Sequence, residues 1–174
     1  FSLDEFYHVF TRGVDKRVIF YDRSDYERFL ALLYLVNGER AIDLGEIDDE
    51  HIYTFDRGNA LVDVCAFCIM SNHLHLLLHE IQEGGISRFM RKLLTGYAMY
   101  FNKKYRRNGA LFEGKFRAKH LDSDNYLKHI PIYIHLNSLD ISFPNWKERG
   151  VEDLVRAEKY AKEYPYSSLI DYAS

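Results

Sequence analysis

Two histidines separated by one residue offer the clearest chemistry in this chain. His73 and His75 flank Leu74 and follow a turn at Ser71 and Asn72, in a stretch that reads as a β-strand. Side chains two positions apart in a strand project from the same face. Both imidazoles therefore point the same way and form half of a site for a divalent metal ion. The alternative is a pair of surface or hydrogen-bonded histidines without a metal.

A third ligand has to come from another part of the chain. Asn137 follows Tyr133 by four residues near the end of a predicted helix, so the two side chains share a helix face. An amide oxygen suits a hard cation such as Mg²⁺ or Mn²⁺, and the tyrosine one turn earlier would then lie beside the ion. A phenol is a poor nucleophile until it is activated. The alternative is that Tyr133, one of 14 tyrosines, packs in the core.

Basic residues are concentrated in one part of the chain. Between residues 86 and 120, ten lysines and arginines accompany one acid, Glu113, which gives this stretch a charge of +9 although the whole chain carries −3. Clustered cations attract a polyanion by releasing its counterions. The alternative is a solvated helix face whose interleaved aromatic residues lie in the core. With Arg12 from the first predicted strand, the candidate nucleic-acid-binding residues are Arg88, Arg91, Lys92, Lys103, Lys104, Arg106, Arg107, Lys115, Arg117 and Lys119.

Length and composition indicate one globular domain over residues 1–174. Hydrophobic residues make up 47% of the chain and charged residues 28%, which argues against disorder. No apolar run is long enough to span a bilayer, and the first residues do not resemble a signal peptide. Two cysteines, Cys65 and Cys68, cannot complete a structural zinc site unaided. We therefore expect a cytoplasmic protein with reduced, buried thiols.

Hydrophobic periodicity and turn residues predict an order of strand, helix, strand, strand and helix. The predicted elements are a strand over Phe6–Arg12, a helix capped near Asp22, strands over 60–70 and 73–80, and helices over 87–107, from about 122 toward 137 and over 151–162. This order predicts an α+β fold, a ferredoxin-like antiparallel sheet with helices packed on one face. Residues 38–58 are interpreted as an acidic insertion and residues 139–174 as a C-terminal extension.

Five segments carry a family resemblance. In chain order they are YHVFTRG at 7–13, CIMSNHLHLL at 68–77, YFNKKY at 100–105, GALFEGKF at 109–116 and YIHLN at 133–137. Together they resemble the one-tyrosine transposases of the His-hydrophobe-His class, especially the REP-associated branch. The chain departs from the family pattern at Pro131, inside the helix that carries the tyrosine. We expect either a kink there or a second helical segment with Pro131 in its first turn.

The resemblance implies a role for each candidate residue. His73, His75 and Asn137 would bind Mg²⁺ or Mn²⁺, and Tyr133 would attack a phosphodiester of single-stranded DNA, with Tyr126 as the fallback nucleophile. The implied partner is single-stranded or hairpin DNA, and relatives act as homodimers or as monomers. A membrane partner is not expected, and a DNA substrate implies a location at the nucleoid.

We therefore predict a metal-dependent single-stranded DNA transposase or endonuclease that cleaves and rejoins hairpin-bearing DNA through a 5′-phosphotyrosine intermediate. The alternative is a catalytically retired, DNA-hairpin-binding or regulatory protein derived from such an enzyme. Salt-sensitive binding without metal-dependent nicking would favour this alternative. A third hypothesis, a ferredoxin-like metalloenzyme acting on a small molecule, leaves the +9 stretch unexplained.

Overall fold

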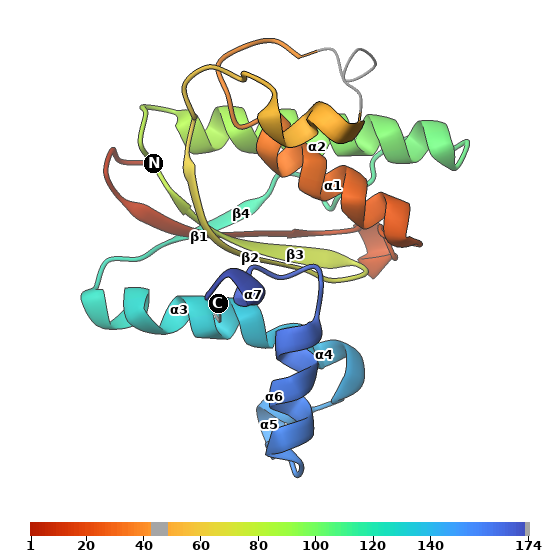
Figure 1. The fold of residues 1–174 in the computed structure, drawn as a ribbon, viewed down its shortest axis with the longest axis vertical. Helices are drawn as coiled ribbons and strands as arrows, with labels where there is room; N and C mark the ends of the chain where they lie inside the picture. Colours follow the sequence, from red (N-terminus) through yellow and green to blue (C-terminus); the bar gives the residue numbers. More distant parts are fainter. Residues whose placement is uncertain (43–48, 173–174) are drawn as a thin grey trace.

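An antiparallel sheet lies at the centre of the computed structural model, which describes residues 1–42 and 49–172 (Figure 1). The acidic insertion predicted over 38–58 thus lies partly outside the described residues. The strands are β1 (Phe6–Arg12), β2 (Asp63–Ile69), β3 (His73–His79) and β4 (Arg117–His120), in the spatial order β2-β3-β1-β4. His75 of β3 lies opposite Phe10 of β1 and Cys68 of β2. Because β3 and β1 are internal strands, neighbours on both sides fix the positions of their side chains.

Both faces of the sheet are apolar, so each face needs a cover. Alternate residues of β3, Leu74, Leu76 and Leu78, lie in the core shared with α1 (Arg23–Leu35) and α2 (Gly85–Lys104). Leu77 points the other way, into a second core with residues of α3 (Asp124–Leu136). The predicted α+β antiparallel fold is confirmed. As expected, α1 and α2 share one face, but α3 covers the opposite face (Figure 1).

Helix α1 begins after Asp22, an N-cap residue that can be recognised in the sequence. The side chain of Asp22 accepts a hydrogen bond from the backbone N–H of Asp25, and the side chain of Asp25 accepts one from the backbone N–H of Asp22. This capping box satisfies N–H groups that a helix start otherwise leaves unpaired. Aromatic residues of α2, including Phe89, Tyr97 and Phe101, are fully buried in the core. These aromatics among the cations are therefore core residues rather than platforms for bases.

Helix α3 carries the candidate tyrosine and runs through Pro131 as one helix. Its N-cap is Ser123, whose side chain accepts from the backbone N–H of Tyr126. A separate helical segment that starts at Pro131, one of the two expectations, does not form. Ile130 and Ile134 are buried against the sheet on either side of the proline. This burial opposes the cost of a proline in a helix interior, about 3 kcal/mol for the lost hydrogen bond together with the clash of its ring.

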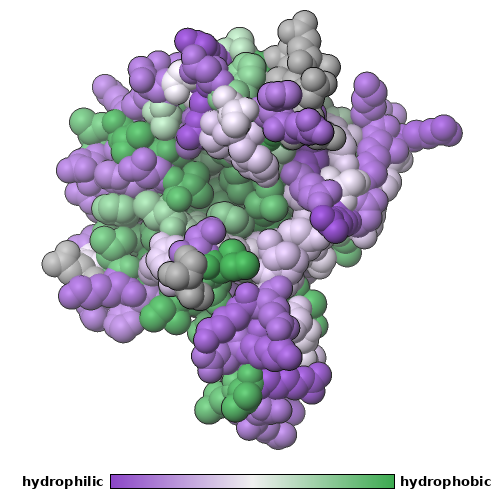
Figure 2. Space-filling model, viewed as in Figure 1, coloured by the Kyte–Doolittle hydropathy of each residue, from purple (hydrophilic) through white to green (hydrophobic). Residues whose placement is uncertain are grey.

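The C-terminal residues form a projecting helical segment and then return to the sheet (Figure 1). The projection contains α4 (Leu139–Ser142), α5 (Trp146–Arg149) and α6 (Leu154–Glu163), and α7 (Leu169–Tyr172) lies back beside the sheet. Figure 2 shows that the projection is mainly hydrophilic in this view. The segment between α6 and α7 then runs along the edge of β2, where Ile69 N donates to Tyr166 O and Ser168 N donates to Phe67 O.

Two short 3-10 helices, η1 (Val14–Lys16) and η2 (Asp49–Thr54), complete the described elements. None of the helices in the described ranges combines the length and the apolar character that a membrane crossing requires.

Candidate active site

The two histidines of β3 meet a third histidine from β1. His75 Nδ1 lies 2.8 Å from Nε2 of His8, and the ring centroids of His73 and His75 are 5.3 Å apart. His73 Nδ1 lies 2.6 Å from Oδ1 of Asn72, so the amide oxygen accepts its N–H. Metal-binding histidines commonly donate their second ring N–H to such a partner, which fixes the tautomer. This leaves Nε2 of His73 as the nitrogen that would bind a metal ion, and Nε2 of His75 serves likewise in the tautomer that donates Nδ1–H to His8.

Burial keeps these imidazoles neutral. Desolvation, with a smaller effect of Lys119, lowers the pKa of His8 to about 4. Desolvation, followed by electrostatic interaction with His8, His73 and Lys147, lowers the pKa of His75 to about 2. Burial also lowers the pKa of His73. Neutral imidazole is the form that binds metal ions, so the donor set fits a divalent cation at neutral pH.

The candidate nucleophile lies beside this histidine group in the same chain. The ring centroid of Tyr133 is 6.0 Å from that of His75 and 5.8 Å from that of His8, both in edge-on geometry. Tyr133 is 42% exposed, so a substrate can approach it from solvent. Tyr126 lies two turns earlier on α3, where its hydroxyl accepts a hydrogen bond from Lys119. The described structure thus brings Tyr133, rather than Tyr126, against the imidazoles.

Asn137 is fully buried at the end of α3, and both the nitrogen and the oxygen of its side-chain amide form hydrogen bonds. Its Nδ2 donates to the backbone oxygen of Tyr133 at 2.7 Å, and its Oδ1 accepts from Lys147 Nζ at 2.9 Å. After burial, the positive charge of Lys147 also contributes to the lowered pKa of His73 and of His75. Asn137 could bind a metal ion through Oδ1 when the ion replaces the hydrogen bond from Lys147.

The other acidic and histidine side chains of the described residues do not join these candidate metal ligands. His79, on the same face of β3, is held by Asp4 and Asp63 at 2.9 and 3.0 Å, and therefore belongs to a separate group. Within residues 1–42 and 49–172, no three His, Cys, Asp or Glu side chains are arranged to hold a metal ion. A metal site here would accordingly depend on the two imidazoles and a neutral third ligand.

A pocket of about 150 Å³ opens next to the histidine pair. Its wall combines cationic side chains with one acid, Glu113, whose carboxylate pairs with Arg12 at 2.6 Å. The lining residues are Phe10, Thr11, Arg12, His73, His75, Glu113, Lys115 and Arg117. Three of the predicted nucleic-acid-binding residues, Arg12, Lys115 and Arg117, therefore lie at the candidate site. Lys119 follows on β4, where it contacts Tyr126 of α3.

The other predicted nucleic-acid-binding residues lie on α2 or just after it, across the sheet from the histidines. They are Arg88, Arg91, Lys92, Lys103, Lys104, Arg106 and Arg107. Some have intramolecular partners: Lys92 donates to Gly38 O, Arg88 to Gln82, and Lys104 to Asp22, Ser24 and Asp25. Arg91, Lys103 and Arg107 line an open groove along α2. The basic stretch of the sequence thus divides between two faces of the sheet.

Sequence reasoning overlooked two residues of this site. His8 alternates with Phe10 along β1, so its face could be inferred, but its approach to His75 depends on β1 lying next to β3. Lys147 is ten residues beyond Asn137 in the C-terminal segment, and no motif singles it out.

Comparisons with known proteins bear on the fold and on the family of this chain. No curated protein sequence matches the chain. A solved structure described as a REP-associated tyrosine transposase bound to a REP hairpin has a TM-score of 0.62 and 12% identity, over 98% of this chain and 80% of that one. That likeness shows a shared fold. A model described as an IS200-like transposase matches residues 34–137, which include His73, His75, Tyr133 and Asn137. The predicted resemblance is confirmed: this chain belongs to the IS200-like transposase family.

Proposed function

We propose that this protein is a divalent-metal-dependent transposase or endonuclease that cleaves and rejoins single-stranded DNA through a 5′-phosphotyrosine intermediate. The observation that carries the proposal is the contact of Tyr133 with His75 and His8, beside a pocket that contains Arg12, Lys115 and Arg117. In this proposal the exposed Tyr133 is the nucleophile, the neutral imidazoles are metal ligands and the neighbouring cations bind phosphate.

In this proposal each group has a separate task. The Tyr133 oxygen attacks the phosphorus of the scissile phosphate and gives up its proton to solvent or a neighbouring base. The bond from phosphorus to the 3′ oxygen breaks, and the departing oxygen takes a proton to become a free 3′-hydroxyl. His73, His75 and Asn137 would hold Mg²⁺ or Mn²⁺, which supplies charge stabilisation at the phosphate. A 3′-hydroxyl can later reverse the step and rejoin DNA, because the phosphotyrosine link conserves the bond energy.

Hairpin DNA is the partner that we propose. The similar solved structure is described as bound to a REP hairpin, and the groove along α2 offers Arg91, Lys103 and Arg107 for contacts with a phosphate backbone. Because Tyr133 lies beside the imidazoles of the same chain, the proposal applies to a monomer as well as to a homodimer. A DNA substrate would place the protein at the nucleoid, in the cytoplasm.

The decisive experiment compares Tyr133→Phe with Tyr126→Phe. Purified protein is incubated with Mn²⁺ and a labelled single-stranded hairpin from the DNA that flanks the gene, and the covalent adduct is resolved on a denaturing gel. We expect Tyr133→Phe to abolish the adduct because it lacks the nucleophilic oxygen, and Tyr126→Phe to retain it. An undiminished adduct in Tyr133→Phe would refute the assignment of this nucleophile.

The catalytically retired alternative makes a different prediction in the same assay. It requires salt-sensitive hairpin binding by the wild-type chain with no adduct at any metal concentration. Under the enzyme proposal, replacing His73 and His75 by Ala abolishes cleavage and leaves much of the DNA affinity, because the cations supply the phosphate contacts.

A further inference from the structure

A lysine outside the family-matched residues lies beside the candidate nucleophile. Nζ of Lys147 donates to Asn137 Oδ1 and to Asp140 Oδ2, each at 2.9 Å, and lies 5.5 Å from the ring centroid of Tyr133. The second oxygen of Asp140 accepts from Trp146 Nε1 at 2.6 Å. One carboxylate therefore holds two successive residues of α5, and it fixes the lysine ammonium over the end of α3.

The ammonium of Lys147 retains the capacity to bind one more acceptor. An ammonium group has three N–H donors, and within the described part of the chain Asn137 and Asp140 supply two hydrogen-bond acceptors. The Lys147 side chain is 40% exposed, so a third acceptor can arrive from solvent. Tyr133 is exposed as well. A phosphate that reaches the tyrosine oxygen therefore comes close to this cation.

We propose that Lys147 is a further catalytic residue, whose ammonium donates to a non-bridging oxygen of the scissile phosphate while Asp140 holds it in place. This proposal rests on the function proposed above. When the Tyr133 oxygen adds to phosphorus, negative charge on the non-bridging oxygens increases until the bond to the 3′ oxygen breaks. A cation fixed in advance by Asp140 stabilises that developing charge more than it stabilises the ground state.

The first test measures the rate of the chemical step. Lys147→Gln and Lys147→Arg are compared with Lys162→Gln, which removes a lysine of the same C-terminal segment that pairs only with exposed Glu158 among the described residues. In single-turnover reactions with Mn²⁺ and the flanking hairpin, we expect Lys147→Gln to slow adduct formation about 100-fold. Lys147→Arg should recover part of the rate, and Lys162→Gln should react like the wild type.

The second test measures phosphate contact without metal or chemistry. Fluorescence anisotropy in EDTA gives the affinity of each variant for the same oligonucleotide over a range of salt concentrations. For single-stranded contacts, loss of one phosphate contact lowers the slope of log affinity against log salt by about 0.7. We expect this decrease in Lys147→Gln, whereas Lys162→Gln should keep the wild-type slope.

These outcomes separate the two proposals. A folded Lys147→Gln protein that reacts at the wild-type rate would overturn the catalytic role. Slower adduct formation with an unchanged salt slope would also overturn it, because the lysine would then act through Asn137 rather than on phosphate. A wild-type chain that forms no adduct, while Lys147→Gln still lowers the salt slope, would instead refute the proposed cleavage activity, and the catalytic role with it.

Discussion

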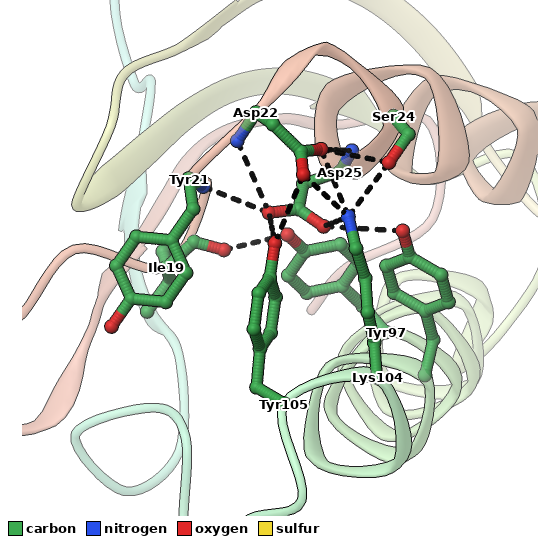
Figure 3. Close-up of polar contacts among 9 residues, drawn as sticks. Ile19, Tyr21, Asp22, Ser24, Asp25, Tyr97, Lys104 and Tyr105 are labelled. Carbon is green, nitrogen blue, oxygen red and sulfur yellow. Dashed lines mark hydrogen bonds and ion pairs between the residues drawn. The ribbon is translucent and has the colours of Figure 1, made fainter.

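Two polar clusters lie on opposite faces of the sheet. They differ in whether their members use up one another's charges and hydrogen-bonding groups. Between α1 and α2, the fully buried carboxylate of Asp25 accepts from Lys104 at 2.7 Å, from Tyr105 at 2.8 Å and from the backbone N–H of Tyr21 at 2.8 Å (Figure 3). Tyr100 donates to it as well. The charge is paired and both oxygens have donors, so this cluster joins two helices and has little capacity left for a ligand.

The cluster on the α3 face has the opposite character. His8 and His75 are buried bases and His73 is partly buried. Their hydrogen bonds in the described residues run between His8 and His75 and from His73 to Asn72. Burial lowers the pKa of each ring, so the group is neutral. Tyr133 lies exposed beside it. The comparison teaches that unused ligand capacity, rather than polarity or net positive charge, distinguishes the candidate site from a structural cluster.

The largest effect on stability should come from the paired cluster. Asp25→Ala would leave Lys104 without its buried partner and remove the acceptor for two tyrosine hydroxyls. We expect the free energy of unfolding, measured by urea denaturation, to fall by about 3–5 kcal/mol. Asp56→Ala is the matched control, because Asp56 forms an exposed pair with Arg40 and should cost less than about 1 kcal/mol. Equal losses in both variants would mean that the Asp25 cluster is not structural.

A smaller and different effect is expected on the α3 face. His8→Ala removes the partner of His75 Nδ1, and loss of such an outer partner typically weakens metal binding 10–100-fold, or about 1.4–2.7 kcal/mol. Titration with Mn²⁺, followed by electron paramagnetic resonance, measures this affinity directly. His79→Ala is the control, since His79 is bonded to Asp4 and Asp63 instead. Unchanged affinity in His8→Ala would remove His8 from the site.

The sequence allowed most of the fold to be predicted, because local signals define its elements. The aromatic and β-branched run Phe6–Arg12 ends at Gly13, and it forms β1 with those bounds. The N-cap at Asp22 is likewise local. The side of the sheet that α3 covers could not be predicted, because Leu77 and its neighbours on β3 make both faces apolar. Alternation predicts two faces without indicating which helix packs on which.

The site was predictable where its residues are close in sequence. The spacing of His73 and His75 indicated one half, whereas the contact between His8 and His75 joins residues 67 positions apart. Strand order creates that contact, and no local pattern encodes strand order. The basic stretch was recognisable as a charge excess, but the partners of its members were not. Lys104 is the clearest case, since Asp25 is 79 positions away.

The prediction with the smallest expected effect concerns the cations of α2. It tests whether those exposed in the groove bind DNA while Lys104 belongs to the Asp25 cluster. Arg91 is exposed in the groove along α2, whereas Lys104 is engaged by Asp22 and Asp25. We expect Arg91→Gln to weaken binding of the hairpin duplex a few-fold and to lower the slope of log affinity against log salt by about 0.9. Lys104→Met should keep the wild-type slope but lower the free energy of unfolding, because its charge belongs to the Asp25 cluster. Anisotropy measurements over a range of salt concentrations, on protein shown to be folded by circular dichroism, distinguish the two. A lower slope in Lys104→Met would mean that the cluster opens to bind phosphate, and the contrast between the two faces would then fail.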